Sequence, residues 1–75
     1  MEFEKIRAVV ADVCNIDENK ITLKSDLVHD LGADSLDLYQ IVMQLESYFE
    51  IEVPDERLSM VRTMEDILNL VKESV

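Results

Sequence analysis

Ser35 is the residue whose type and position could support covalent chemistry. Gly32 is the only glycine in the sequence, and it lets the chain turn sharply just upstream. Asp34 is a good helix N-cap, and Asp37 completes an acidic form of the capping box. Ser35 is then the first helical residue, where unpaired N–H groups and the helix dipole favour negative charge, although the two aspartates offset part of that gain. A phosphate esterified to Ser35 is therefore electrostatically favourable.

The surroundings of Ser35 are not those of a catalytic serine. Ser35 lacks the flanking glycines of a nucleophile elbow, and the only histidine, His29, lies upstream in a predicted loop. The sequence also contains no spacing typical of metal ligands. Taken alone, the tripeptide Asp34-Ser35-Leu36 favours a simpler interpretation, in which Ser35 is an ordinary polar residue in the first turn of a helix.

The size of the chain favours a carrier or binding module over an enzyme. Its 75 residues form one expected domain, 1–75. A domain of this size removes only about 60% of the surface of the unfolded chain from water, so it has one small core. An enzyme cleft of roughly several hundred cubic ångströms would consume most of that core.

The location expected from the sequence is the cytoplasm. The N-terminal residues lack the basic and apolar regions of a signal peptide, and no apolar run is long enough to span a bilayer. The single cysteine, Cys14, cannot form an internal disulfide, which agrees with a reducing compartment.

The charge of the chain is strongly acidic and unevenly distributed. Seven basic and 17 acidic residues give a net charge of −10. Nine of the acidic residues, and no Lys or Arg, lie between Ser25 and Glu56. Such a chain repels nucleic acid and anionic membranes and attracts proteins with basic patches. We therefore expect basic protein partners and no membrane insertion.

The spacing of apolar residues predicts an all-α fold. Apolar residues recur every three or four positions over about residues 3–14, over Ser35 to about Glu50, and over about residues 64–74, with the spacing continuing to Val75. The segment from Asp55 to Met60 is expected to form a short third helix, because the helix dipole favours the acidic residues at its start. Residues 15–34 are expected to form a long anchored loop with a helical turn near residues 25–29. Residues 51–54 are expected to be an extended connector, not a strand.

The central helix carries two apolar stripes. One stripe is predicted to enter the core: Leu38, Ile41, Val42, Leu45 and Phe49. The other points roughly 130° away and has two acids beside it. We call it the docking stripe: Leu36, Tyr39, Met43, Glu46 and Glu50. An exposed apolar strip with acidic edges is typical of a surface that binds successive partners, unless the third helix or the loop covers part of it.

The sequence resembles an acyl carrier protein of the dissociated bacterial fatty-acid synthesis type. The resemblance extends over the whole chain and is strongest in two segments, Leu31-Gly32-Ala33-Asp34-Ser35-Leu36-Asp37 and Phe49-Glu50-Ile51-Glu52-Val53-Pro54-Asp55-Glu56. It implies an antiparallel four-helix bundle with a short third helix and a long loop between the first two helices. It also implies a monomer that carries growing acyl chains as thioesters and catalyses no reaction itself.

The resemblance also implies roles for individual residues. Ser35 would carry 4′-phosphopantetheine, transferred from coenzyme A by a phosphopantetheinyl transferase (holo-acyl carrier protein synthase), and Asp34 and Leu36 would complete the attachment motif. The residues expected to contact basic docking patches of fatty-acid synthesis enzymes are Leu36, Asp37, Tyr39, Gln40, Met43, Glu46 and Glu50. Two of these depart from the pattern, because the family commonly has Glu at Gln40 and a small aliphatic residue at Tyr39.

Two other functions remain open on the sequence alone. The domain could carry polyketide, peptide or D-alanyl groups in place of fatty acyl chains. In a different class, it could be a small acidic adaptor that has no prosthetic group.

Overall fold

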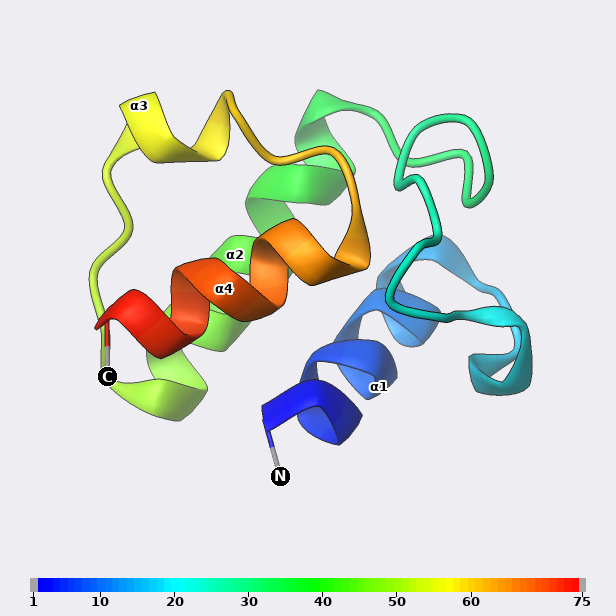
Figure 1. Cartoon of the computed structure of the whole chain (residues 1–75), viewed down its shortest axis with the longest axis horizontal. Coiled ribbons are helices and arrows are strands. Elements are labelled where there is room, and N and C mark those ends of the chain that lie inside the picture. The colour runs from blue at the N-terminus through cyan, green and yellow to red at the C-terminus, as the bar shows by residue number, and fades with distance from the viewer. Residues whose placement is uncertain (1, 75) are drawn as a thin grey trace.

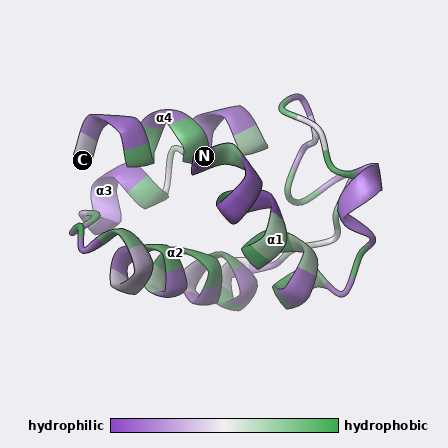
Figure 2. Cartoon of the chain, turned by 90° about the horizontal axis from the view of Figure 1, so that it is seen from below, coloured by the Kyte–Doolittle hydropathy of each residue, from purple (hydrophilic) through white to green (hydrophobic). Residues whose placement is uncertain are grey.

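A computed structural model describes residues 2–74, in which the regular elements are all helices. They are α1 (Glu2–Cys14), the short 3₁₀ helix η1 (Glu18–Lys20), α2 (Ser35–Phe49), α3 (Asp55–Leu58) and α4 (Met64–Ser74). α4 lies in front of α2 in Figure 1, and the turned view of Figure 2 shows these two helices on opposite sides of the molecule, with α1 and α3 between them. The predicted all-α bundle, with its short third helix and long first loop, is confirmed. No helix within this part of the chain has the length and apolar character needed to cross a membrane.

One apolar core joins the long helices and the loop between α1 and α2. α1 packs against both α2 and α4. Fully buried side chains come from each of these helices and from the loop: Ile6, Val10, Ile21, Leu27, Ile41, Leu45, Met64, Ile67 and Val71. Ile21 and Leu27 belong to the loop, and Leu31 is buried as well, so the prediction that apolar residues anchor the loop is confirmed at these positions. Leu23 and Val28, which were expected among the anchors, are exposed instead.

The two predicted faces of α2 are also confirmed. Ile41, Val42 and Leu45 are buried, and Leu38 and Phe49 pack against the core from half-buried positions. On the opposite face, Leu36 and Met43 keep 71% and 61% of their surface exposed. The helix therefore separates core packing from surface contacts along its whole length.

The ends of the helices differ slightly from the predictions. α3 ends at Leu58 rather than Met60, because the N–H groups of Met60 and Val61 bond to carbonyls three residues back, at 3.1 Å each, in a tighter turn. η1 was not predicted; the Asp17 carboxylate caps it by accepting from the Asn19 N–H at 2.9 Å. The predicted continuation to Val75 lies outside the described residues.

The separation of faces on α2 predicts unequal costs for truncating its side chains. Leu45→Ala should lower the free energy of unfolding by about 2–5 kcal/mol, because it leaves a cavity in the core. Met43→Ala, on the exposed face, should lower it by less than about 1 kcal/mol. Urea titrations followed by circular dichroism measure both values, and equal losses would show that the faces are wrongly assigned.

Candidate functional site

Paired hydrogen bonds between Asp34 and Asp37 fix the start of α2. The Asp34 carboxylate accepts from the Asp37 N–H at 2.9 Å, and the Asp34 N–H donates to the Asp37 carboxylate at 3.2 Å. Asp34 is in an extended conformation, with φ of −107°, so the chain enters the helix abruptly. The predicted capping box is thereby confirmed. Ser35 is the first residue of α2 and its side chain is exposed.

Gly32 makes the turn that leads into the capping box. Its φ is +71°, in the left-handed region that residues with a Cβ rarely adopt. Open space surrounds the position that a Cβ would occupy, so only the backbone conformation calls for glycine here. Leu31 and Ala33 are buried on either side of it, and the Ala33 N–H donates to the Leu27 carbonyl at 2.8 Å. The segment before Ser35 is therefore held at both ends of the turn.

Backbone hydrogen bonds fasten the loop to the start of α4. The Leu27 N–H donates to the Arg62 carbonyl at 2.8 Å, and the Met64 N–H donates to the Ser25 carbonyl at 3.1 Å. A third bond joins the Glu65 N–H to the Leu23 carbonyl at 3.0 Å. The N–H groups at the start of α4 thus find partners in the loop, and the loop gains a fixed position relative to the core.

Asp26 caps the turn between this fastened segment and Gly32. Its carboxylate accepts from the N–H groups of Val28 and His29 at 2.9 and 2.8 Å, and its own N–H donates to the Asp30 carboxylate at 2.8 Å. The His29 N–H is the main reason that the pKa of Asp26 lies below its ordinary value, and the Val28 N–H acts in the same direction. The sequence analysis did not predict this capping role of Asp26. An aspartate at the start of a predicted helical turn could have indicated it.

A groove opens beside Ser35. It has a volume of about 180 Å³ and lies between α2 and α3. Its walls are formed by residues of α2 on one side and of α3 with its following residue on the other: Ser35, Leu38, Tyr39, Asp55, Leu58 and Ser59. We call it the Ser35 groove. Tyr39, predicted to contact partners, also forms part of this wall, and 46% of its surface is exposed.

The remaining residues predicted to contact partners differ in their surroundings. Gln40 is exposed, and Asp37 is half-buried at the capping box. Glu46 is half-buried, and its carboxylate accepts from the Val53 N–H at 2.8 Å. Glu50 ends α2 in the left-handed conformation, with φ of 56°. Two of these acids, Asp37 and Glu46, therefore also hold local structure.

Three further apolar side chains are exposed, and of these the sequence analysis considered only Val28, which it expected to anchor the loop. Val28, Tyr48 and Met60 each expose more than half of their surface. The Lys5 ammonium lies 4.2 Å from the centre of the Tyr48 ring, a cation–π contact between α1 and α2.

Comparison with known proteins identifies the family. The model of the family described as "Phosphopantetheine attachment site" matches residues 4–71. The acyl carrier protein of Clostridium acetobutylicum is 43% identical over 72 residues, covering 96% of this chain and 94% of that protein. The chain belongs to the acyl carrier protein family.

Other relatives agree with this family assignment. The acyl carrier protein of Clostridium perfringens strain 13 is 38% identical over 71 residues, covering 95% of this chain and 93% of that protein. A solved structure described as an acyl carrier protein from Mycobacterium tuberculosis superposes with a TM-score of 0.91 at 32% identity, covering 97% of each chain. The chain is thus a carrier protein rather than a catalyst, and its prosthetic group is phosphopantetheine.

The geometry around Ser35 suits this prosthetic group. A phosphodiester requires an accessible hydroxyl, and Ser35 is exposed at the first turn of α2. Negative charge is stabilised at that end of a helix by the dipole and by unpaired N–H groups. The Ser35 groove adjoins the same residue and offers apolar walls at Leu38 and Leu58.

The capping role of Asp26 predicts a pH-dependent stability. Folding lowers its pKa below the ordinary 3.8, so the charged cap stabilises the folded chain at higher pH and the stabilisation is lost as the pH falls through the lowered pKa. Asp26→Asn should therefore melt below the wild type at pH 7, and the difference should shrink as the pH falls from about 5.

Calorimetry of both proteins between pH 7 and pH 3 measures that difference. Asp12→Asn, which removes the same charge from an exposed position on α1, serves as the control. A difference for Asp26→Asn that stays constant with pH would contradict a charged cap at this position.

Proposed function

We propose that Ser35 carries 4′-phosphopantetheine and that the chain delivers acyl groups, held as thioesters on the terminal thiol, between enzymes of fatty-acid biosynthesis. The observation that carries the proposal is an exposed serine at the first turn of α2, fixed by a reciprocal capping box and adjoining a groove. Asp34 and Leu36 flank it as the rest of the attachment motif.

Attachment requires a phosphopantetheinyl transferase as the first partner. The Ser35 oxygen attacks the pantetheine phosphate of coenzyme A, a new O–P bond forms, and adenosine bisphosphate leaves with the electrons of the broken bond. The serine proton passes to the transferase or to water. The chain contributes position in this step, since the capping box and the Gly32 turn fix the backbone that carries the Ser35 hydroxyl.

Acidic residues of α2 supply attraction to basic partners. Asp37, Glu46 and Glu50 lie along the helix that starts at Ser35, and the net charge of the chain is −10. Long-range attraction speeds encounters with basic surfaces, while Leu36 and Met43 give a small apolar contact once the two proteins meet. Such a contact favours short-lived complexes, which suits a carrier that must leave each enzyme.

The Ser35 groove gives the acyl chain an apolar place to begin entering the protein. Leu38 and Leu58 both line it, and Leu38 also packs against the core. Burying one methylene group gains about 0.8 kcal/mol, less the cost of parting α2 from α3. The groove therefore favours shelter for medium or long acyl chains over short polar ones.

Replacement of Ser35 tests the attachment site directly. A phosphopantetheinyl transferase with coenzyme A should add one phosphopantetheinyl group to the wild type and none to Ser35→Ala, as measured by intact mass. Ser59→Ala is the matched control, because Ser59 lines the same groove, and it should be modified like the wild type. Modification of Ser35→Ala would contradict the assignment.

Replacement of Met43 tests the docking stripe. Met43→Glu should lower kcat/KM of the transferase about tenfold, because a charge replaces an apolar contact at the interface. The melting temperature should stay within about 2 °C of the wild type, since Met43 is outside the core. Gln44→Glu adds the same charge at an exposed neighbouring position and serves as the control. Equal losses in the two variants would indicate a general charge effect and no docking stripe.

A further inference from the structure

A second groove lies between α3 and α4. It has a volume of about 230 Å³, and its walls are formed by Arg57 of α3, by the turn that follows α3, and by one side of α4. We call it the Arg57 groove. It shares no lining residue with the Ser35 groove, whose α3 wall is formed by Asp55, Leu58 and Ser59. The two grooves are therefore separate surfaces of the molecule.

The Arg57 groove has an apolar floor and an exposed methionine at its edge. Val61 and Leu70 line the groove and are buried. Met60 exposes 72% of its surface, more than any other large apolar side chain in residues 2–74. A flexible apolar side chain at such a place suits a surface that adapts to a partner. The volume is below the roughly 300–1,000 Å³ of small-molecule sites, so the groove suits one inserted side chain.

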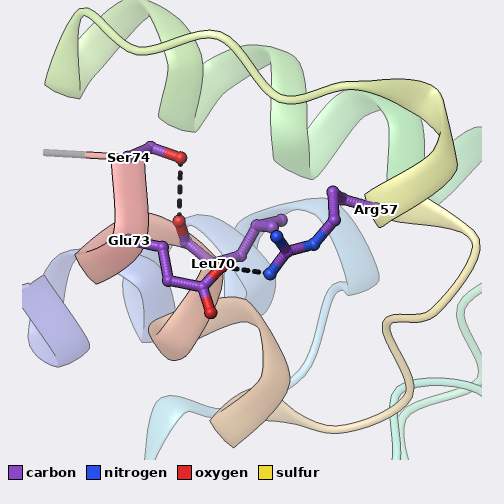
Figure 3. Close-up of polar contacts among 4 residues, drawn as sticks. All are labelled: Arg57, Leu70, Glu73 and Ser74. Atoms are coloured by element: carbon purple, nitrogen blue, oxygen red, sulfur yellow. Dashed lines mark hydrogen bonds and ion pairs between the residues drawn. The ribbon is translucent and has the colours of Figure 1, made fainter.

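Charged groups from both helices also line the Arg57 groove. The Arg57 guanidinium of α3 pairs with the Glu73 carboxylate of α4 (Figure 3). About half of each side chain is exposed to solvent, so the pair adds little to stability and is readily exchanged for contacts with another molecule. The Asp66 carboxylate is fixed, because one of its oxygens accepts from the N–H groups of Arg62 and Thr63 at 2.9 and 3.1 Å. Asp66 therefore keeps a negative charge at a defined place beside the groove.

The charge of the chain selects the kind of occupant. With a net charge of −10, the chain repels a second copy of itself, nucleic acid and anionic membranes, and it attracts basic proteins. Cations of a basic partner find acceptors at Asp66 and Glu73. Arg57, once released from Glu73, can stack on an aromatic ring, and aromatic side chains are frequent anchors of protein interfaces. The floor and the charges of the groove thus favour an aromatic side chain from a basic segment.

We propose that the Arg57 groove is a second docking surface, which binds a basic protein segment that inserts one aromatic side chain over Val61 and Leu70. No residue of the docking stripe lines this groove, and neither does Ser35. A protein bound there leaves Ser35 and the docking stripe free for an enzyme, so one chain can be held by one protein while another acts on it. This inference does not depend on the proposed function of Ser35.

Titration with a defined basic peptide tests the second docking surface. The probe is the acetylated and amidated peptide Lys-Lys-Phe-Lys-Lys, and binding is followed by NMR of the isotope-labelled chain. Saturable shift changes are expected at Met60, Val61, Asn69 and Leu70. The peptide Lys-Lys-Ser-Lys-Lys has the same charge but no aromatic anchor, so it should bind at these residues about tenfold more weakly. Equal binding of the two peptides, or no saturable change at these residues, would overturn the proposal.

Two methionine variants locate the binding of the Phe peptide. Met60→Ser removes the apolar edge of the Arg57 groove and should weaken binding about tenfold. Met43→Ser removes an exposed methionine from the docking stripe and should leave binding unchanged. Both variants should fold like the wild type, because neither side chain lies in the core. Equal losses in the two variants, or a loss in Met43→Ser alone, would show that the peptide does not bind in this groove.

Modification of Ser35 in the presence of the peptides tests whether the two surfaces are independent. A phosphopantetheinyl transferase with coenzyme A should modify Ser35 at the same rate in saturating Phe peptide as in the Ser peptide. Slower modification in the Phe peptide would place that peptide on the docking stripe and overturn the proposal. A chain that is never modified would contradict the proposed function and leave the peptide binding measured by NMR intact. Shift changes at Met60 on concentrating the chain alone would identify a second copy as the occupant and overturn a basic partner.

Discussion

The reciprocal hydrogen bonds between Asp34 and Asp37 are the interaction on which the rest of the candidate site depends. They determine that α2 begins at Ser35, which places its hydroxyl at the positive end of the helix dipole. The turn at Gly32 and the cap at Asp26 bring the chain to that point, and bonds from the loop to the start of α4 fix its position. A small domain thus gives one serine a defined presentation without enclosing an active site.

The division of α2 into two faces lets the same helix stabilise the fold and, in the proposed function, receive partners. Its core face packs with α1, and its exposed face starts beside Ser35. Acidic residues along the exposed face repel one another, so they lower stability while they attract basic proteins. The proposed recognition of basic partners would therefore use none of the residues of the small core.

Local patterns predicted most of the structure, and contacts across irregular segments account for what they missed. Helical spacing and capping residues predicted α1, α2, α4 and the capping box, because each depends on neighbours three or four residues away. The hydrogen bond from Val53 to Glu46 crosses the end of a helix and an extended connector, so no periodicity indicates it. The groove beside Ser35 was not predicted for the same reason, since it requires α3 to fold back toward the start of α2.

The most direct test of the central claim is the mass of the protein purified from its own cells, followed by fragmentation to locate any added group. A carrier should exceed the mass of the polypeptide by one phosphopantetheinyl group, with or without an acyl chain, and the added mass should lie on Ser35. A measured mass equal to that of the polypeptide alone would instead support an acidic adaptor without a prosthetic group. An added group on another residue would contradict the role assigned to Ser35.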